Sequence, residues 1–224
     1  MSDSLAEYRM MAAMRSGGTS SSSIKHKVLE VVAAHGLSGR VLDFGAGTGE
    51  LAGLLAGAEG VEVYAADIML RPDGFSGVEW FEGDLNEQLD WRPGFFDAVI
   101  CSEVIEHLEN PRLTFRTMNR LLKPGGRLLL TMPNQENIRS YLNLMFRGHF
   151  AAFQGAEYPA HITALLRLDL SRICSEAGFS EPSFFYVDYG WMPITRTTWQ
   201  RFSFNLLRGR LFSDTVGIIA NKER

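Results

Sequence analysis

Short apolar runs alternate along the chain with segments in which apolar residues recur at helical spacing. Five runs have the length of strands buried on both faces, at 40–44, 61–66, 78–82, 96–101 and 127–132. The helical spacing predicts helices between them, one that begins after Ser23 as its cap and two over 50–58 and 111–122. Strands that alternate with helices predict an α/β fold, with a mostly parallel sheet covered by helices on both faces.

The pattern loosens after residue 134. It predicts an amphipathic helix over 137–150, a second helix over 168–177, and two further strands over 183–189 and 215–220. We expect the strand at 215–220 to be antiparallel and to pair with 183–189 as a hairpin.

Two segments are punctuated by turn and linker residues. The Lys-Pro-Gly-Gly sequence at 123–126 predicts a turn that leads into the fifth strand. The pattern predicts no helix or strand over residues 1–23. The glycines, threonine and serines at 16–23 are typical of a flexible linker. A disordered tail and a lid that orders when ligand binds both remain open for this segment.

The composition narrows the class of protein. Of the 224 residues, 46% are hydrophobic and 21% are charged, as in globular proteins with a real core. The net charge of −4 argues against a nucleic-acid partner. Two cysteines, Cys101 and Cys174, are too few for a disulfide framework and indicate a reducing compartment. No apolar signal core or run of about 18 apolar residues is present, so we expect a cytoplasmic location.

A glycine-rich turn joins the first predicted strand to the following helix. Its glycines fall at 45, 47 and 49, and Glu50 follows them, which differs from the Gly-x-Gly-x-x-Gly spacing of dinucleotide sites. Such a turn lets the backbone approach a ligand closely and presents free N–H groups to an anion. Asp67 ends the second strand, where it can accept ribose hydroxyls, and Asp84 follows the third, where it can accept an adenine amino group.

Together these residues resemble the class I S-adenosylmethionine (SAM) methyltransferases. The resemblance extends to 96–103 and 121–126 and is strongest over 25–132. It implies a Rossmann-like, seven-stranded sheet, mostly parallel with an antiparallel C-terminal strand, and SAM as cofactor with S-adenosylhomocysteine (SAH) as product. The implied cofactor residues are Asp43, Gly45, Ala46, Gly47, Gly49, Asp67, Ile68, Met69, Asp84, Leu85, Cys101 and Glu103.

The resemblance also implies a domain organisation. A flexible segment, 1–23, precedes a single methyltransferase domain, 24–224. Within that domain, 24–134 forms the SAM-binding core, and 135–224 selects the substrate and supplies the C-terminal strands.

A Glu-Val-Ile-Glu-His sequence follows the fourth strand, at the edge where open α/β sheets bind ligands. If it begins a helix, Glu103, Glu106 and His107 project from one face. Two carboxylates and an imidazole so close together favour a cation between them.

This sequence is similar to that of ubiquinone-biosynthesis O-methyltransferases and small-RNA 2′-O-methyltransferases, which bind a divalent cation at these positions. The RNA enzymes add a downstream histidine, for which His161 lies at a comparable separation and His149 is the second choice. The resemblance thus implies Glu103, Glu106, His107 and His161 as ligands of a divalent cation such as Mg²⁺ or Mn²⁺. The RNA enzymes have a second histidine where Leu108 stands, which again disfavours a nucleic acid.

Two other interpretations of the cluster remain open. In a metal-free site, Glu103 contacts the cofactor, His107 or His161 acts as the catalytic base, and Glu106 orients His107. In the other, His107 is structural. Since a hydroxyl acceptor needs help with its proton, the cluster favours O-methylation, with metal-free N- or C-methylation as an alternative. A non-catalytic SAM-binding or partner-binding module is a further alternative.

The segment 191–212 contains four arginines and no acidic residue. It predicts a solvated helix face, a dimer contact or a peripheral membrane contact. We expect the acceptor to be a small or lipid-linked molecule, such as a sugar or a catechol-like ring. The oligomeric state is not predicted.

Overall fold

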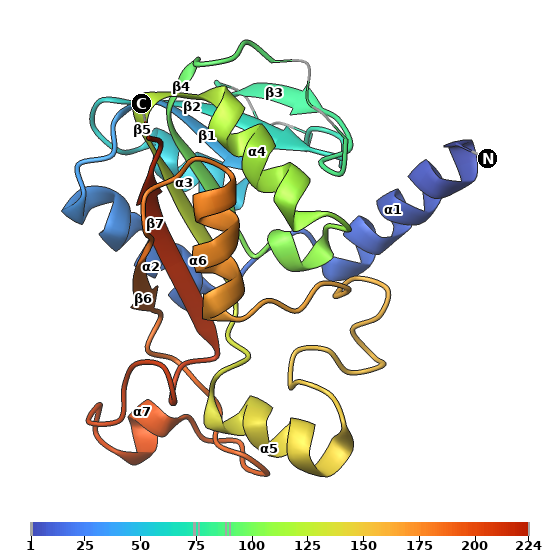
Figure 1. Ribbon diagram of the computed structural model, residues 1–224, viewed down its shortest axis with the longest axis vertical. Helices are drawn as coiled ribbons and strands as arrows, with labels where there is room; N and C mark the ends of the chain where they lie inside the picture. The colour runs from blue at the N-terminus through green and yellow to red at the C-terminus, as the bar shows by residue number, and fades with distance from the viewer. Residues whose placement is uncertain (1, 74, 76, 88, 90, 224) are drawn as a thin grey trace.

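The computed structural model describes residues 2–73, 75, 77–87, 89 and 91–223. Figure 1 shows a twisted sheet with helices packed against it. The strands are β1 (Gly39–Phe44), β2 (Val61–Asp67), β3 (Glu79–Glu82), β4 (Phe96–Ser102), β5 (Leu122–Pro133), β6 (Ser183–Tyr186) and β7 (Thr215–Asn221). The helices are α1 (Ser2–Ser16), α2 (Ser22–Ala34), α3 (Glu50–Ala56), α4 (Pro111–Leu121), α5 (Ile138–Arg147), α6 (Arg167–Glu176) and α7 (Trp199–Phe202), with a short 3₁₀ helix η1 (Ile105–His107).

The seven strands form one sheet in the order β3-β2-β1-β4-β5-β7-β6. Strands β1 to β5 are parallel, and β7 runs antiparallel to both neighbours. The predicted hairpin is confirmed, since Ser183 to Tyr186 pair with Ile219 to Val216. The expected fold class is therefore confirmed. The strand order reverses between β1 and β4, which places the ligand crevice of such a sheet at their carboxyl ends.

Two apolar cores lie on opposite faces of the sheet. One buries Phe115 and Met118 of α4 with Leu170 of α6, and the other buries Val28 of α2 with Leu55 of α3. The central strands supply side chains to both cores, which is why they read as continuous apolar runs. The helices thus fix the sheet from both sides and leave its carboxyl edge available for a site.

Three local predictions are wrong. The segment 123–126 is not a turn ahead of the strand but a bulge within β5, where Gly125 N–H donates to Lys222 O and Lys222 N–H donates to Gly126 O. The helix begins after Ser21, whose Oγ accepts from Ile24 N, rather than after Ser23. The helix expected within 191–212 is only the four-residue α7, because Phe204 and Asn205 adopt left-handed backbone angles that prevent its continuation.

The N-terminal segment contains an element that its composition does not predict. Residues Ser2–Ser16 form α1, which extends from the body of the molecule in Figure 1. Its base lies against the sheet edge, where Thr48 N–H donates to Gly18 O at 2.8 Å. The predicted flexibility of 1–23 stays a prediction, but the segment has a defined helical structure.

Across the described part of the chain, no helix combines the length and apolar character needed to cross a bilayer.

Candidate active site

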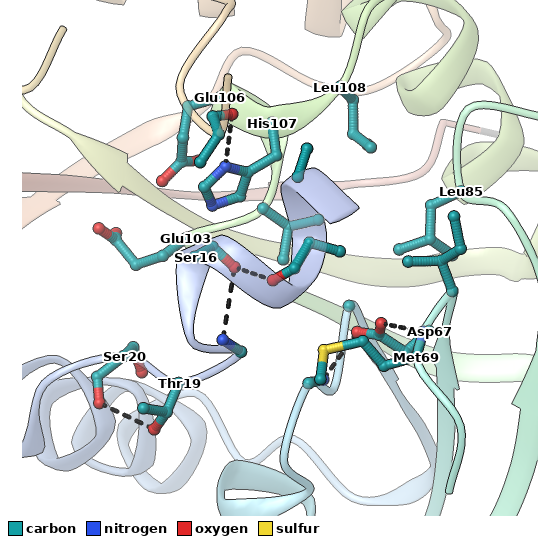
Figure 2. A pocket seen from close by; sticks show the side chains of 18 of the residues that line it. Ser16, Thr19, Ser20, Asp67, Met69, Leu85, Glu103, Glu106, His107 and Leu108 are labelled. Atoms are coloured by element: carbon teal, nitrogen blue, oxygen red, sulfur yellow. Dashed lines mark hydrogen bonds between the residues drawn. The ribbon is translucent and has the colours of Figure 1, made fainter. Parts of the chain in front are cut away.

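A cavity of about 340 Å³ opens at the carboxyl ends of β1, β2 and β4. The glycine loop, η1, the C-terminal half of α1 and the segment 156–162 line it. Figure 2 shows Ser16 and Thr19 on one side, Asp67 and Met69 on another, and the Glu103–His107 segment above them. The volume lies in the range of pockets that hold drug-sized ligands, about 300–1,000 Å³.

The glycine loop is shaped by contacts that exclude side chains. Gly45, Gly47 and Gly49 all have positive φ angles, of 91°, 53° and 76°. A Cβ on Gly47 would overlap the carbonyl of Gly18, and one on Gly45 would overlap Val104. The loop is therefore pressed between the N-terminal segment and η1, with its backbone facing the cavity.

Asp67 holds this loop in place. Its Oδ2 accepts from Gly47 N and its Oδ1 from Met69 N, both at 2.7 Å. Burial raises the pKa of Asp67, and these backbone donors oppose that shift. Each oxygen retains a further lone pair, so the carboxylate can still accept the ribose hydroxyls that the sequence predicts for it.

Asp43 is a buried acid beneath the loop, and one of its two carboxylate oxygens has no partner in the described part of the chain. Its side chain is wholly buried, and Oδ2 has no hydrogen-bond partner among the described residues. Burial, and then the nearby charge of Asp67, raise the pKa of Asp43 to about 7. A buried acceptor of this kind requires a donor, and the amino group of the SAM methionine moiety is a suitable one. The residues present therefore fit SAM.

Asp84 lines the cavity as predicted, but its carboxylate is paired with α1. Arg9 Nη1 lies 2.7 Å from Asp84 Oδ2 and 3.0 Å from Glu87 Oε1, and Arg9 Nη2 lies 2.8 Å from Glu109 Oε2. The three carboxylates raise the pKa of Arg9, chiefly through the hydrogen bond to Glu109. Arg9 is not predictable as a site residue from the sequence, because it lies in the segment where no helix is predicted.

A second basic residue that the sequence analysis missed is Lys25. It is a buried lysine beside the apolar stripe of α2, and its Nζ lies 2.5 Å from Glu50 Oε2, next to the glycine loop. The sequence does indicate that Lys25 needs a partner, because a lysine that lies among Ile24, Val28 and Val31 is costly to bury without one.

The Glu-Val-Ile-Glu-His segment does not form the helix that the spacing predicts. Only η1 is helical, and Glu103 has a positive φ of 57° while its N–H donates to Thr131 O. Ligand atoms of Glu106, His107 and His161 lie within 4.8 Å of one another, and Glu103 is outside that set. The structure thus brings three of the four predicted metal ligands together.

In both histidines the ring nitrogen Nδ1 is hydrogen-bonded to a backbone carbonyl. His107 Nδ1 lies 2.8 Å from Ala160 O, and His161 Nδ1 lies 2.5 Å from Ala152 O. A carbonyl only accepts, so each Nδ1 carries a proton, and in the neutral form of either ring Nε2 is the nitrogen with the free lone pair. Metal-bound histidines are commonly oriented in this way. Burial lowers the pKa of His107, which favours the neutral ring.

Each of the two glutamates has a buried carboxylate oxygen that lacks a hydrogen-bond partner among the described residues. Glu103 Oε1 and Glu106 Oε2 have no hydrogen-bond partner within the described chain. Burial raises the pKa of Glu103 to about 7 and that of Glu106 well above its usual range, with the charge of Glu103 adding to the latter. A proton or a cation must therefore compensate this pair, and the residues present fit a divalent cation.

The other predicted cofactor residues divide into two groups. Ala46, Ile68, Met69 and Leu85 line the cavity. In the described part of the chain, Cys101 and Gly49 do not. Cys101 packs into the apolar core, because successive residues of β4 face opposite sides and the next one, Ser102, faces the cavity. Gly49 instead caps α3 and lies against Phe75.

Comparisons with known proteins agree with this geometry. A family model described as a methyltransferase domain matches residues 18–180. A ubiquinone biosynthesis O-methyltransferase of Azoarcus sp. (strain BH72) is 30% identical over 182 residues, which is 72% of each chain. Another, of Dechloromonas aromatica (strain RCB), is 36% identical over 130 residues, 53% of this chain and about half (51%) of that protein. A SAM-dependent methyltransferase structure from Archaeoglobus fulgidus superimposes with a TM-score of 0.64 at 20% identity, covering 89% of this chain and 93% of that one.

Proposed function

Since the chain belongs to the methyltransferase-domain family and is a SAM-dependent enzyme, we propose that it methylates a hydroxyl oxygen of a small or lipid-linked acceptor. The observation that carries this proposal is the cluster of Glu106, His107 and His161 in the cofactor cavity. A catechol-like ring or a sugar is the acceptor class we favour. The names of the relatives, which are O-methyltransferases, support the same choice.

The cofactor supplies a methyl group on a good leaving group, so the protein needs to align the acceptor and handle its proton. Asp67 and the glycine loop position the ribose and methionine parts, and Asp43 receives the amino group. The acceptor then enters the cavity beside η1 and the segment 156–162, so that its hydroxyl lies near Glu106, His107 and His161.

We propose that these three residues hold a divalent cation. Two imidazole nitrogens and one carboxylate favour Mn²⁺ or another transition metal over Mg²⁺, which prefers an all-oxygen shell. Such a cation, when bound, lowers the pKa of an acceptor hydroxyl. Glu103 lines the same cavity as these three residues. Its carboxylate is charged when the three residues hold a cation and protonated when they do not.

Methyl transfer from labelled SAM to catechol and to sugar acceptors tests the reaction. We expect O-methylated catechol as product and a rate that falls at least a hundredfold in Glu106→Gln and in His161→Ala, with SAH affinity retained. Methyl transfer only to nitrogen or carbon would overturn the proposal. Retained SAH binding with no transfer to any acceptor would favour the non-catalytic module.

Chelation separates the metal-assisted from the metal-free site. We expect the purified protein to bind Mn²⁺ in calorimetry, and EDTA to abolish transfer that Mn²⁺ then restores. If the rate is unchanged after EDTA and yet falls in His107→Ala, the imidazole acts as the base without a metal.

A further inference from the structure

Large apolar side chains are exposed together at one end of the molecule. They lie on α5 and in the segment 191–212, two regions that are separated by 43 residues in the sequence. Phe146 on α5 is 75% exposed, while Phe204 and Leu206 beyond α7 are 90% and 84% exposed. Ile194 is fully exposed and has a positive φ of 63°, an unfavourable backbone angle for a β-branched residue. Packing within this chain does not account for such exposure.

The two regions form a single unit, which we call the platform (138–147 and 191–212). Ile138 N–H donates to Leu211 O at 3.1 Å, and Asn134 Nδ2 donates to Arg210 O at 2.7 Å. The Arg139 guanidinium lies 3.5 Å from Asp214 Oδ2. Figure 1 shows α5 and α7 close together at the lower end of the molecule. The exposed apolar side chains are therefore presented from a fixed surface.

Positive charge surrounds these side chains. The platform contains six arginines and no acidic residue, although the whole chain has a net charge of −4. Arg139 and Arg210 pair with Asp214 and Glu136. Within the described residues the other four form no ion pair, and all four are exposed, namely Arg147, Arg196, Arg201 and Arg208.

The platform lies at the edge of the sheet that also holds the cavity. Pro133 at the carboxyl end of β5 pairs with Thr215 at the start of β7. The chain therefore leaves the sheet towards α5 and returns from 191–212 at the same carboxyl edge at which β1, β2 and β4 end. A surface that binds the platform is thus brought to the side on which the acceptor enters.

We propose that the platform docks peripherally on a lipid bilayer that contains anionic headgroups. Exposed aromatic and aliphatic side chains surrounded by arginines match the two layers of such a surface, acyl chains below and negative charge above. This inference rests on the proposed function only in that a lipid-linked acceptor would be reached from the bilayer. It extends the predicted contact of 191–212 to α5 and selects anionic lipid.

Vesicle flotation of the full chain tests the proposal. We expect binding to vesicles of phosphatidylcholine mixed with phosphatidylglycerol at low salt, and little binding to phosphatidylcholine alone. The triple variant Phe146→Ser, Ile194→Ser, Phe204→Ser should no longer float. Each arginine near an anionic surface contributes about a fivefold factor, so Arg147→Ala, Arg196→Ala, Arg201→Ala together should lower the partition coefficient about a hundredfold.

Matched controls change the same residue types elsewhere. Leu54→Ser with Leu168→Ser on α3 and α6, and Arg116→Ala with Arg172→Ala on α4 and α6, should float as the wild type does. SAH calorimetry on every variant separates this proposal from the enzymatic one, since the platform residues do not line the cavity and SAH affinity should be unchanged.

Wild-type protein that does not float with anionic vesicles, or platform variants that float as well as wild type, would overturn the proposal. So would a dimer in analytical ultracentrifugation that the triple serine variant dissociates, because the platform would then be covered by a second copy of the chain.

Discussion

At the scale of single residues, the glycine loop contains a position that only glycine can occupy without strain. Gly47 has a left-handed backbone angle, and a Cβ there would collide with the carbonyl of Gly18. We expect Gly47→Ala to displace the N-terminal segment from the loop and to weaken SAH binding at least a hundredfold in calorimetry. Gly53→Ala, within α3, is the control, since the added Cβ would lie at an ordinary contact distance of 3.6 Å from Phe75. It should leave SAH binding intact and stabilise the protein by about 0.5–1 kcal/mol. Equal SAH affinity in Gly47→Ala and wild type would contradict this account.

We expect Asp43 to lower the stability of the folded protein while it contributes to cofactor binding. Its folded pKa of about 7 lies above the ordinary aspartate pKa of 3.8. Below the lower value both states hold the proton, so the group has no effect on stability. Between the two values only the unfolded state loses it, so stability falls as pH rises, and above about 7 the full cost remains. Asp43→Asn should therefore raise the free energy of unfolding at pH 8 by at most about 4 kcal/mol, and by little near pH 4.

The same substitution should weaken SAH binding about tenfold or more at pH 8, because the amide cannot form a charge-assisted hydrogen bond with the amino group. Urea unfolding at the two pH values and SAH calorimetry measure both effects. A variant that is less stable at pH 8 than the wild type would show that Asp43 has a partner that the cavity geometry does not reveal.

At the scale of elements, Arg9 makes the ion pairs that hold α1 over the cavity. Arg9 joins it to three carboxylates on two loops and is itself largely buried, with 13% of its side chain exposed. We expect Arg9→Ala to raise the SAH dissociation rate about tenfold in stopped-flow measurements, and to remove most of the salt dependence of that rate. Glu7→Gln, on the same helix, is the control and should behave as the wild type does. Slower SAH release in Arg9→Ala would mean instead that Arg9 competes with adenine for Asp84.

The local sequence pattern predicts the elements that depend on their own residues. It does not predict the elements that depend on partners distant in the sequence. The parallel strands are predictable because burial makes most of their central residues apolar. Helix α1 is not, because Arg9 finds its partners 75 to 100 residues downstream. The start of β5 has a turn composition, yet pairing with Lys222 extends it.

The candidate site divides in the same way. The glycine loop, Asp67 and Asp84 follow from spacing, because each lies where a strand ends. The convergence of His161 with Glu106 and His107 does not, since it depends on the path of the irregular segment after α5. The sequence places Cys101 at the cofactor, whereas the structure places it in the apolar core. A one-residue difference along a strand reverses the face to which a side chain points.

At the scale of the whole molecule, two functional surfaces share one edge of a rigid sheet. The cavity is bounded by α1, the glycine loop and 156–162, whereas the platform is bonded to the ends of β5 and β7. Apart from this shared edge they have no residue in common. Ligands of the two surfaces should therefore stabilise different parts of the chain.

Hydrogen exchange can separate these parts. We expect SAH to slow amide exchange in α1, in 45–50 and in 156–162, because it bridges elements that otherwise open locally. Anionic vesicles should slow exchange in 138–147 and 191–212 and leave α1 unchanged. The amides of β1 and β4, paired on both sides at the centre of the sheet, should exchange only through global unfolding under both conditions. Vesicles of phosphatidylcholine alone are the control. If vesicles protected α1 as strongly as SAH does, the N-terminal helix rather than the platform would be the part of the chain that meets the bilayer.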